Sequence, residues 1–234
     1  MVMTTSILKY PHFFEHEPID LGYEKLERVT ADTGRVYTDP DNNPYPSVTT
    51  VLSILSEKGI AAWRARVGEE EANRISAQAS GRGTLVHKCI ENYVAGELPQ
   101  GNGIMPHILD MFYSIKPTID NSLTKVYAQE APLYSKHLGL AGTVDCVGVW
   151  NGKNSVIDWK TSKKLKPKKW ISNYFMQCAA YAIMWEERTG MAITQLVTAV
   201  AVDNEQPQIF IEHRDDWDKE LIETINEYKR RKKL

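Results

Sequence analysis

The chain has 234 residues, of which 42% are hydrophobic and 25% are charged, and its formal net charge is −2. This composition is typical of a globular protein, and it argues against a disordered chain or one that binds polyanions through its overall charge. The charge is unevenly distributed, because acidic residues are frequent in the first fifty positions, lysines crowd residues 160–169, and the chain ends in YKRRKKL. Such concentrated basic segments can still bind a polyanion locally.

Neither membrane insertion nor secretion is indicated by the sequence. No apolar run approaches the length of a transmembrane helix, and residues 1–20 lack the basic and apolar regions of a secretory signal. Cys89, Cys146 and Cys178 are widely spaced, which predicts buried thiols in a reducing compartment. We therefore expect a cytoplasmic protein without a membrane partner, either bacterial or, if phage-encoded, in the host cytoplasm.

The N-terminal segment is predicted to be extended before the first helix begins. Residues 1–46 are rich in Pro, Gly, Asp and Asn, which favours extended segments and turns, with a candidate hairpin over 32–46. Ser47 is a typical helix-capping residue, and it precedes an apolar-periodic segment over 48–56.

Three further helices are predicted before the first long strand. A charged helical pattern covers 60–79, and the SGRG sequence at 80–83 is expected to break it. A second helix is predicted over 84–94 and a third over 104–116.

After residue 124, alternating and β-branched segments predict strands. The predicted strands cover residues 125–135, 140–150, 155–160, 195–202 and 207–213. The Asn-Gly pair at 151–152 lies between two alternating runs, which is the strongest short signal for a hairpin. Helices are predicted over 170–188 and from about residue 215.

This order of elements predicts an α/β fold with a central mixed sheet flanked by helices. We interpret residues 1–234 as one domain. It comprises an extended segment over 1–46, a helical region over 47–118, and an α/β core with a basic tail over 119–234.

Two carboxylates and one ammonium group are predicted to converge on the sheet. Strand side chains alternate between faces, so Asp158 and Lys160 share a face, and Asp145 lies on the preceding strand of the same hairpin. Such a set suits Mg²⁺, which prefers oxygen ligands and can activate water for attack on phosphorus. Taken alone, the Asp158–Lys160 pair is better explained by a salt bridge at a strand end.

The surrounding segments resemble the RecB-like clade of the PD-(D/E)XK nuclease superfamily. The segments that carry the resemblance are GTLVH (83–87), QEAPLYS (129–135), LAGTVDCV (140–147), VIDWKTSKK (156–164) and YFMQCAAYAIMW (174–185). They are most similar to small stand-alone exonucleases of the mitochondrial genome maintenance and phage type. The resemblance implies a restriction-endonuclease-like core with a helical N-terminal addition.

The resemblance also implies a role for each residue that matches a family motif. His87, Asp145 and Asp158 correspond to the metal ligands, the backbone carbonyl of Trp159 completes the shell, and Lys160 is the catalytic lysine. One nitrogen ligand among oxygens suits Mn²⁺ as well as Mg²⁺. A histidine packed in the core is the structural alternative for His87.

Three more positions match family positions near the substrate. Gln177 and Tyr181 match a Q-x-x-x-Y signature, and Glu130 matches an acidic position on the first strand. A helix stripe that packs on the sheet is the alternative for the first two, and an edge-strand charge is the alternative for Glu130.

Basic and aromatic residues beside these positions are candidates for contact with DNA. The predicted DNA-binding residues are Arg64, Arg66, Arg82, Thr161, Ser162, Lys163, Lys164, Lys166, Lys168, Lys169, Trp170 and Tyr174. Aromatic side chains among cations favour single strands, on whose bases they can stack. A solvated lysine loop is the structural alternative. The resemblance implies that the helical region admits a threaded single strand.

We therefore predict a metal-dependent exodeoxyribonuclease that uses one or two Mg²⁺ or Mn²⁺ ions on single-stranded DNA, in DNA replication, repair or recombination. The scattered cysteines predict no iron–sulfur cluster. Because the chain has no Walker motif, a helicase would be a separate protein. The expected partner is single-stranded DNA, and the candidate protein partners are a separate helicase, polymerase or single-strand-binding protein. The alternatives are a structure-selective endonuclease or RNase of the same fold, and a catalytically inactive DNA-binding module.

Overall fold

The computed structural model describes residues 14–23, 25–31, 34–99 and 103–233. The outermost part of the predicted extended segment, residues 1–13, therefore lies outside the described residues. Among the described residues, no helix combines the length and the apolar character that crossing a membrane requires.

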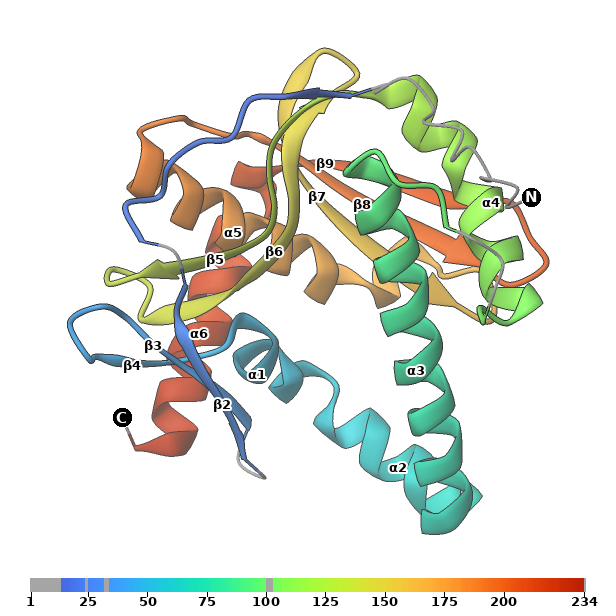
Figure 1. The fold of residues 1–234 in the computed structure, drawn as a ribbon. Coiled ribbons are helices and arrows are strands. Elements are labelled where there is room, and N and C mark those ends of the chain that lie inside the picture. Colours follow the sequence, from blue (N-terminus) through green and yellow to red (C-terminus); the bar gives the residue numbers. More distant parts are fainter. Residues whose placement is uncertain (1–13, 24, 32–33, 100–102, 234) are drawn as a thin grey trace, which may run out of the picture.

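A six-stranded mixed sheet forms the centre of the molecule, with the strand order β1-β5-β6-β7-β8-β9 (Figure 1). Its strands are β1 (Glu15–His16), β5 (Leu123–Ser135), β6 (Leu140–Trp150), β7 (Lys153–Ser162), β8 (Gln195–Val202) and β9 (Gln208–His213). β5, β6 and β7 form an antiparallel meander, β8 pairs with β9 antiparallel, and the β1–β5 and β7–β8 pairs are parallel. The predicted mixed α/β architecture is confirmed.

The β6–β7 turn forms where the Asn-Gly pair predicted it. Asn151 has φ 50° and Gly152 has φ 76°, and two successive positive φ angles match the right-handed twist of the paired strands. By contrast, β7 and β8 are parallel, and the helix α5 (Ser172–Thr189) supplies the crossover that a parallel pair needs.

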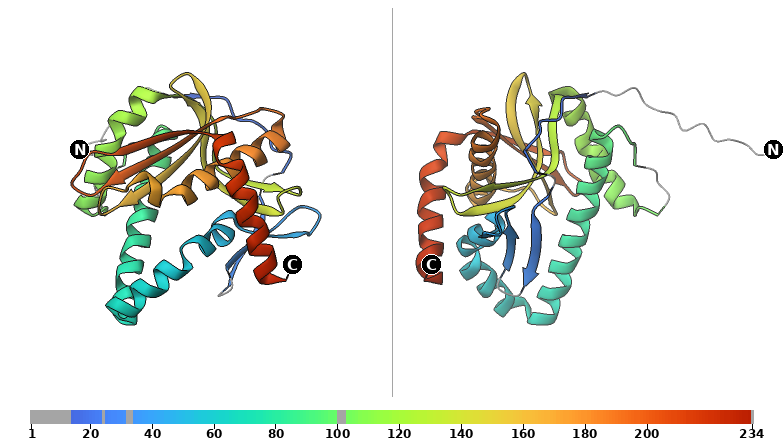
Figure 2. Two further views of the ribbon diagram at one scale, coloured as in Figure 1. Left: turned by 180° about the vertical axis from the view of Figure 1, so that it is seen from behind. Right: turned by 60° about the vertical axis from the view of Figure 1, so that its left-hand side comes forward.

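Helices cover both faces of the sheet (Figure 2, right). α3 (Glu69–Val94) and α4 (Pro106–Ser122) pack on one face, in a core that includes the fully buried Ile90 and Ile115. α1 (Val48–Leu52), α5 and α6 (Asp218–Lys232) pack on the other face. Burial of apolar side chains on both faces is the main stabilising contribution to such a layered fold.

The N-terminal segment forms a second, three-stranded antiparallel sheet. Its strands are β2 (Glu27–Ala31), β3 (Gly34–Thr38) and β4 (Pro44–Pro46). The β3–β4 pair confirms the hairpin predicted in this region, although residues 32–33 lie outside the described part. Tyr37 and Tyr45 pack against Tyr134 and Ala141, so this sheet is docked on the β5–β6 hairpin.

Ser47 caps α1 as predicted, because its hydroxyl oxygen accepts a hydrogen bond from the Thr50 amide. The predicted break at residues 80–83 is wrong. α3 continues through Gly81 and Gly83, and the break lies instead at Gly68, between α2 (Glu57–Val67) and α3. Gly68 has φ 88°, which a residue with a Cβ adopts only at a cost, whereas an interior glycine weakens a helix without ending it.

α4 is also longer than predicted, because it continues past Pro117 to Ser122. The side chain of Ile119 is fully buried in the core formed with α3. Packing of this last turn outweighs the hydrogen bond that the proline removes.

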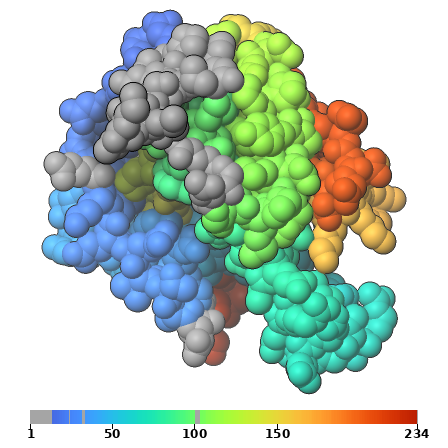
Figure 3. Space-filling model, turned by 45° about the vertical axis from the view of Figure 1, so that its right-hand side comes forward, coloured from blue at the N-terminus to red at the C-terminus, as the bar shows by residue number. Residues whose placement is uncertain are grey.

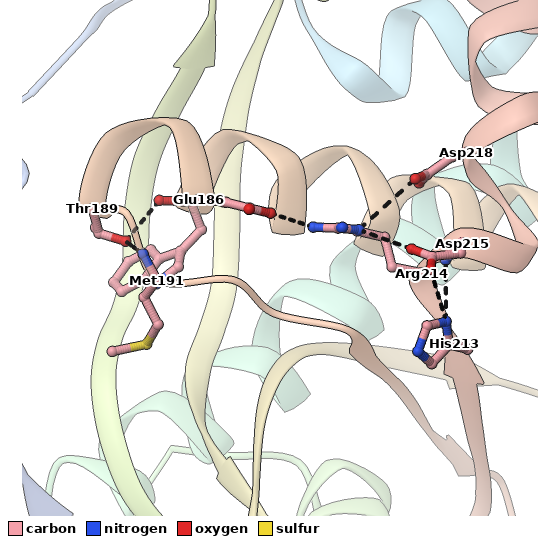
Figure 4. Close-up of polar contacts among 8 residues, drawn as sticks. Glu186, Thr189, Met191, His213, Arg214, Asp215 and Asp218 are labelled. Atoms are coloured by element: carbon pink, nitrogen blue, oxygen red, sulfur yellow. Dashed lines mark hydrogen bonds and ion pairs between the residues drawn. The ribbon is translucent and has the colours of Figure 1, made fainter.

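The C-terminal part of α5 is fixed to the beginning of α6 by a polar cluster (Figure 4). Arg214 forms an ion pair with Glu186 of α5, and its Nε lies 3.8 Å from Asp218 Oδ2 on α6. α5 ends at Thr189, and Gly190 after it has a left-handed conformation with φ 73°, which is typical of the residue that follows a helix.

Candidate active site

Three neighbouring strands each contribute one acidic residue at the same level of the sheet. The pairs Gln129–Cys146 and Ala131–Val144 place Glu130 of β5 opposite Asp145 of β6. On the other side of β6, Asp158 of β7 directly follows Ile157, the partner of Cys146. The three carboxyl groups therefore come from adjacent strands.

The helix α3 places a histidine against this row of acids. His87, Glu130 and Asp145 each offer a ligand atom, and these atoms lie within 4.8 Å of one another. His87 Nδ1 lies 3.6 Å from Asp145 Oδ2, which accepts a hydrogen bond from the Trp159 amide at 2.9 Å. Glu130 has φ 46°, an uncommon conformation for a residue with a Cβ, and such strain is often found at functional sites.

Asp158 is paired with Lys160, as the alternation along the strand predicts. Lys160 Nζ lies 2.5 Å from Asp158 Oδ1, and the two side chains are 19% and 2% exposed. This burial distinguishes the pair from a surface salt bridge. Asp158 Oδ2 is buried and has no hydrogen-bond partner in the part of the chain that the structure describes, and an unsatisfied carboxylate oxygen in such a position is costly. Ligation by Asp158 and by the Trp159 carbonyl stays a prediction.

The protonation equilibria of the cluster are shifted by its surroundings. Desolvation, together with the nearby Asp145 charge, raises the pKa of Glu130 to about 7 and that of Asp158 to about 6. Desolvation also raises the pKa of Asp145, and desolvation with the Lys160 charge lowers that of His87. Burial alone would lower the pKa of Lys160, but the Asp158 and Asp145 carboxylates raise it above its usual value. The site therefore disfavours uncompensated negative charge and keeps its histidine neutral.

The residues of the Q-x-x-x-Y match lie on α5 and face the acids. Gln177 and Tyr181 are both buried, and both line the same cleft as Asp145. Tyr181 can lie close to β6 because position 142 is a glycine. A Cβ at Gly142 would lie 2.7 Å from the Tyr181 hydroxyl oxygen. Burial and the Asp145 charge raise the pKa of Tyr181, so its hydroxyl stays protonated.

These side chains open into a cleft of about 620 Å³ between the N-terminal sheet, α3 and the β5–β6 hairpin. Figure 3 shows the blue N-terminal sheet and the green helices on either side of a hollow, with olive β5 visible inside. The charged residues that line the cleft are Arg28, Arg35, His87, Lys88, Glu91, Glu130 and Asp145. Three of these residues, Arg28, Arg35 and Lys88, were not predicted as site residues from the sequence. The alternation of side chains along β2 and β3 is a signal that groups the two arginines on one face.

The predicted DNA-binding loop follows β7 directly. Thr161 lies near Gly83 of α3, and the buried Ser162 donates a hydrogen bond to the Lys164 carbonyl at 2.6 Å. The Lys166 amide donates to Gln208 of β9 at 2.7 Å, so part of the loop is held against the sheet.

Other side chains of this loop are exposed or paired. Lys163, Lys164 and Lys169 are exposed, and Lys168 forms an ion pair of 2.7 Å with Glu212. Two aromatic residues follow the lysines. Trp170 is 70% exposed, and Tyr174 lies with its ring centroid 5.2 Å from Lys160 Nζ. The loop therefore presents cations and one exposed aromatic ring beside Glu130, Asp145 and Asp158, which we call the acidic cluster.

The arginines predicted to contact DNA lie on α2 and α3. Arg64 pairs with Glu69 of α3. Arg66 is exposed, and Arg82 is half-buried with its Nε lacking a partner among the described residues. The lining of the acidic cleft includes none of these described arginines.

Sequence comparison identifies relatives of the chain. No protein-family model matches it. The chain is 29% identical over 154 residues to "Mitochondrial genome maintenance exonuclease 1" of Mus musculus, a match that covers 58% of this chain and 45% of that protein. The protein of the same name from Xenopus tropicalis is 27% identical over 209 residues, covering 82% and 59%. That from Homo sapiens is 27% identical over 150 residues, covering 59% and 43%.

The chain is a distant homologue of mitochondrial genome maintenance exonuclease 1. The matches span only about half the length of these curated relatives. A solved structure from Eubacterium rectale, described as a candidate exonuclease, aligns with a TM-score of 0.45 and 16% identity over 62% of this chain and 63% of that chain.

Proposed function

We propose that this protein is a metal-dependent nuclease that hydrolyses phosphodiester bonds of single-stranded DNA from an end. The observation that carries the proposal is the group of His87, Glu130 and Asp145 at the cleft, with the buried Asp158–Lys160 pair on the next strand. The distant homology to proteins named as exonucleases supports the same reaction class. The preference for a DNA end rests on that name alone.

The residues of the site fit a divalent cation. One imidazole nitrogen and several carboxylate oxygens suit Mg²⁺ or Mn²⁺, and the unpartnered Asp158 Oδ2 offers a further oxygen. We propose His87, Glu130 and Asp145 as ligands, with Asp158 and the Trp159 carbonyl contributing to the same shell. When bound, such a cation lowers the pKa of water and neutralises charge on the phosphate.

The remaining side chains would position the substrate and the attacking water. The two aspartates keep Lys160 charged, so its ammonium can orient the nucleophile and stabilise negative charge that develops on phosphorus. The Trp159 amide fixes the orientation of the Asp145 carboxylate. The Tyr181 hydroxyl and the Gln177 amide line the cleft, where they can donate hydrogen bonds to phosphate oxygens.

The loop after β7 would hold the single strand beside these groups. Its exposed lysines attract backbone phosphates, and the exposed Trp170 ring can stack on a base. Stacking requires bases that are not paired in a duplex, which favours a single-stranded substrate.

A cleavage assay tests the proposal. End-labelled linear and covalently closed circular single-stranded DNA are incubated with the protein in Mg²⁺, Mn²⁺ or EDTA. We expect cation-dependent loss of the linear strand only, reduced at least about hundredfold by Asp145→Asn and by Lys160→Ala. Lys219→Gln is the matched control, because Lys219 is 89% exposed on α6.

The other outcomes separate the alternatives. Cutting of circles would identify an endonuclease, and equal degradation of an RNA strand would remove the preference for DNA. DNA binding without cleavage in any cation would show that the cluster is not catalytic, and the protein would then be a binding module.

A further inference from the structure

Arg35 lies between the acidic cleft and a second cavity on the same side of the N-terminal sheet. The second cavity has a volume of about 490 Å³ and lies between β2–β3, α1 and α6. Arg35 and Thr49 line both cavities. The two hollows therefore adjoin at Arg35.

The β2–β3 hairpin turns its cationic face toward these cavities. The pairs Arg28–Tyr37 and Thr30–Arg35 place the four side chains on one face of the hairpin. Tyr37 is buried, and its hydroxyl oxygen lies 3.2 Å from the Thr143 hydroxyl oxygen on β6, so this face is directed at the main sheet.

The Arg35 side chain has unused hydrogen-bonding capacity. Its Nε is buried and has no hydrogen-bond partner among the described residues. A buried guanidinium N–H without an acceptor is costly, and a phosphate accepts from guanidinium in a bidentate geometry.

The charges around the second cavity favour an anion. Lys232, from the basic C-terminal turn of α6, lines the cavity together with Arg35. Glu57 is the acidic residue in this lining, and its carboxylate accepts a hydrogen bond from Arg231 at 3.1 Å. Arg35 and Lys232 therefore give the cavity a net positive lining.

The second cavity lies on the opposite side of the molecule from the lysine loop over 163–169. Figure 1 and the left view of Figure 2 show β2–β4 on one side and the end of β7, where that loop begins, on the other. The acidic group of His87, Glu130 and Asp145 lines the cleft that adjoins the second cavity.

We propose that Arg35, with Arg28 and Lys232, binds backbone phosphates of the nucleic acid strand on the far side of the acidic cluster from the lysine loop. The nucleic acid strand then runs from the lysine loop over 163–169, past the acidic cluster, to the cationic side chains of Arg28, Arg35 and Lys232. The inference rests on the proposed function and assigns a role to the N-terminal sheet and to the basic C-terminal turn.

Binding of fluorescently labelled oligothymidylates to the full chain in EDTA tests the inference. With a long oligonucleotide, Arg35→Gln is expected to weaken binding about tenfold. It should also reduce the slope of log K against log salt concentration by about 0.7, the value for one phosphate contact on a single strand. Arg35→Lys keeps the charge and should restore the slope, whereas Lys219→Gln should change neither quantity. An oligonucleotide too short to reach Arg35 should not distinguish the variants.

An unchanged affinity and salt slope in Arg35→Gln, with a wild-type protein that binds and cuts, would overturn this inference and leave the proposed function intact. A wild-type protein that neither binds nor cuts would overturn both. If thermal melting shows that Arg35→Gln is unfolded, Lys232→Gln at the exposed end of α6 gives the same test, and an unchanged slope there overturns the inference.

Discussion

The carboxyl groups of Glu130 and Asp158 hold protons in a pH range where ordinary carboxyl groups are ionised. Their pKa values are raised from 4.5 to about 7 and from 3.8 to about 6 by desolvation and the nearby Asp145 charge. Between about pH 4 and 7 the folded, cation-free protein therefore binds more protons than the unfolded chain. By linkage, the contribution of these groups to the free energy of unfolding falls as pH rises through that window.

A bound cation should restore the free energy of unfolding that is lost as the carboxyl groups of Glu130 and Asp158 ionise. It competes with protons for the carboxylates, and the lowered pKa of His87 leaves its nitrogen free at neutral pH. We expect Mn²⁺ at a hundredfold excess over its Kd at pH 8 to raise Tm by about 5–10 °C, and the same concentration to have little effect at pH 5. Thermal melting at both pH values measures this. An equal gain at pH 5, or a gain retained by Asp145→Asn, would contradict the assignment of the site.

The sequence allowed the position of some site residues to be predicted and not that of others. Strand alternation and the Asn-Gly turn sufficed to place Asp145 and Asp158 on neighbouring strands. They did not show that Glu130, which lies opposite Asp145 across β5 and β6, forms one group of candidate ligands with His87 and Asp145. Such grouping depends on how α3 packs over the sheet, which no local pattern encodes.

Two glycines of the helical region differ in what their backbone requires. Gly68 has φ 88° and ψ 150°, a conformation that is essentially restricted to glycine. Gly81 lies inside α3 and has no positive φ, and a Cβ there would meet no described atom within 4 Å apart from its neighbours in the helix.

Alanine substitutions at these positions should therefore have opposite effects. We expect Gly81→Ala to increase the free energy of unfolding by about 1 kcal/mol. Gly68→Ala should decrease it by about 1–3 kcal/mol. Urea unfolding of the two variants measures both changes. If Gly81→Ala were destabilising instead, the chain would break at residues 80–83 after all.

The strands and most helices were predictable because each has a clear period and a clear end signal, such as Gly190 after α5. The continuity of α3 through Gly81 and Gly83 and the extension of α4 past Pro117 were not predictable in this way. In both helices, the side chains that extend the element past a glycine pair or a proline are buried against a partner element. Tertiary packing outweighed local propensity at these two points.

The two cores of the molecule meet at the sheet that carries the acids. Val144 and Val156 pack toward α5, while Cys146 and Ile157 pack toward α3. The site therefore lies at the centre of the layered fold. The N-terminal sheet, which the sequence predicted only as extended segments with a hairpin, closes one side of the cleft.

The proposed ligands come from α3 and from three strands, β5, β6 and β7, and the helix meets the strands only through contacts between residues far apart in the chain. Non-local pairing forms late and slowly during folding. We expect Mn²⁺ to leave the refolding rate nearly unchanged and to slow unfolding, because the cation stabilises contacts that are absent from the transition state. Stopped-flow measurements with and without Mn²⁺ would show this, and a cation that accelerates refolding would contradict it.

The candidate site is completed only after most of the chain has been synthesised, because β7 follows α3, β5 and β6 in the sequence. Under the proposed function, a growing polypeptide on the ribosome cannot complete the site until β7, which carries Asp158 and Lys160, has been synthesised and has paired with β6. An unfinished copy of such a nuclease would be inert, and hydrolytic capacity would appear only in molecules that have completed their fold.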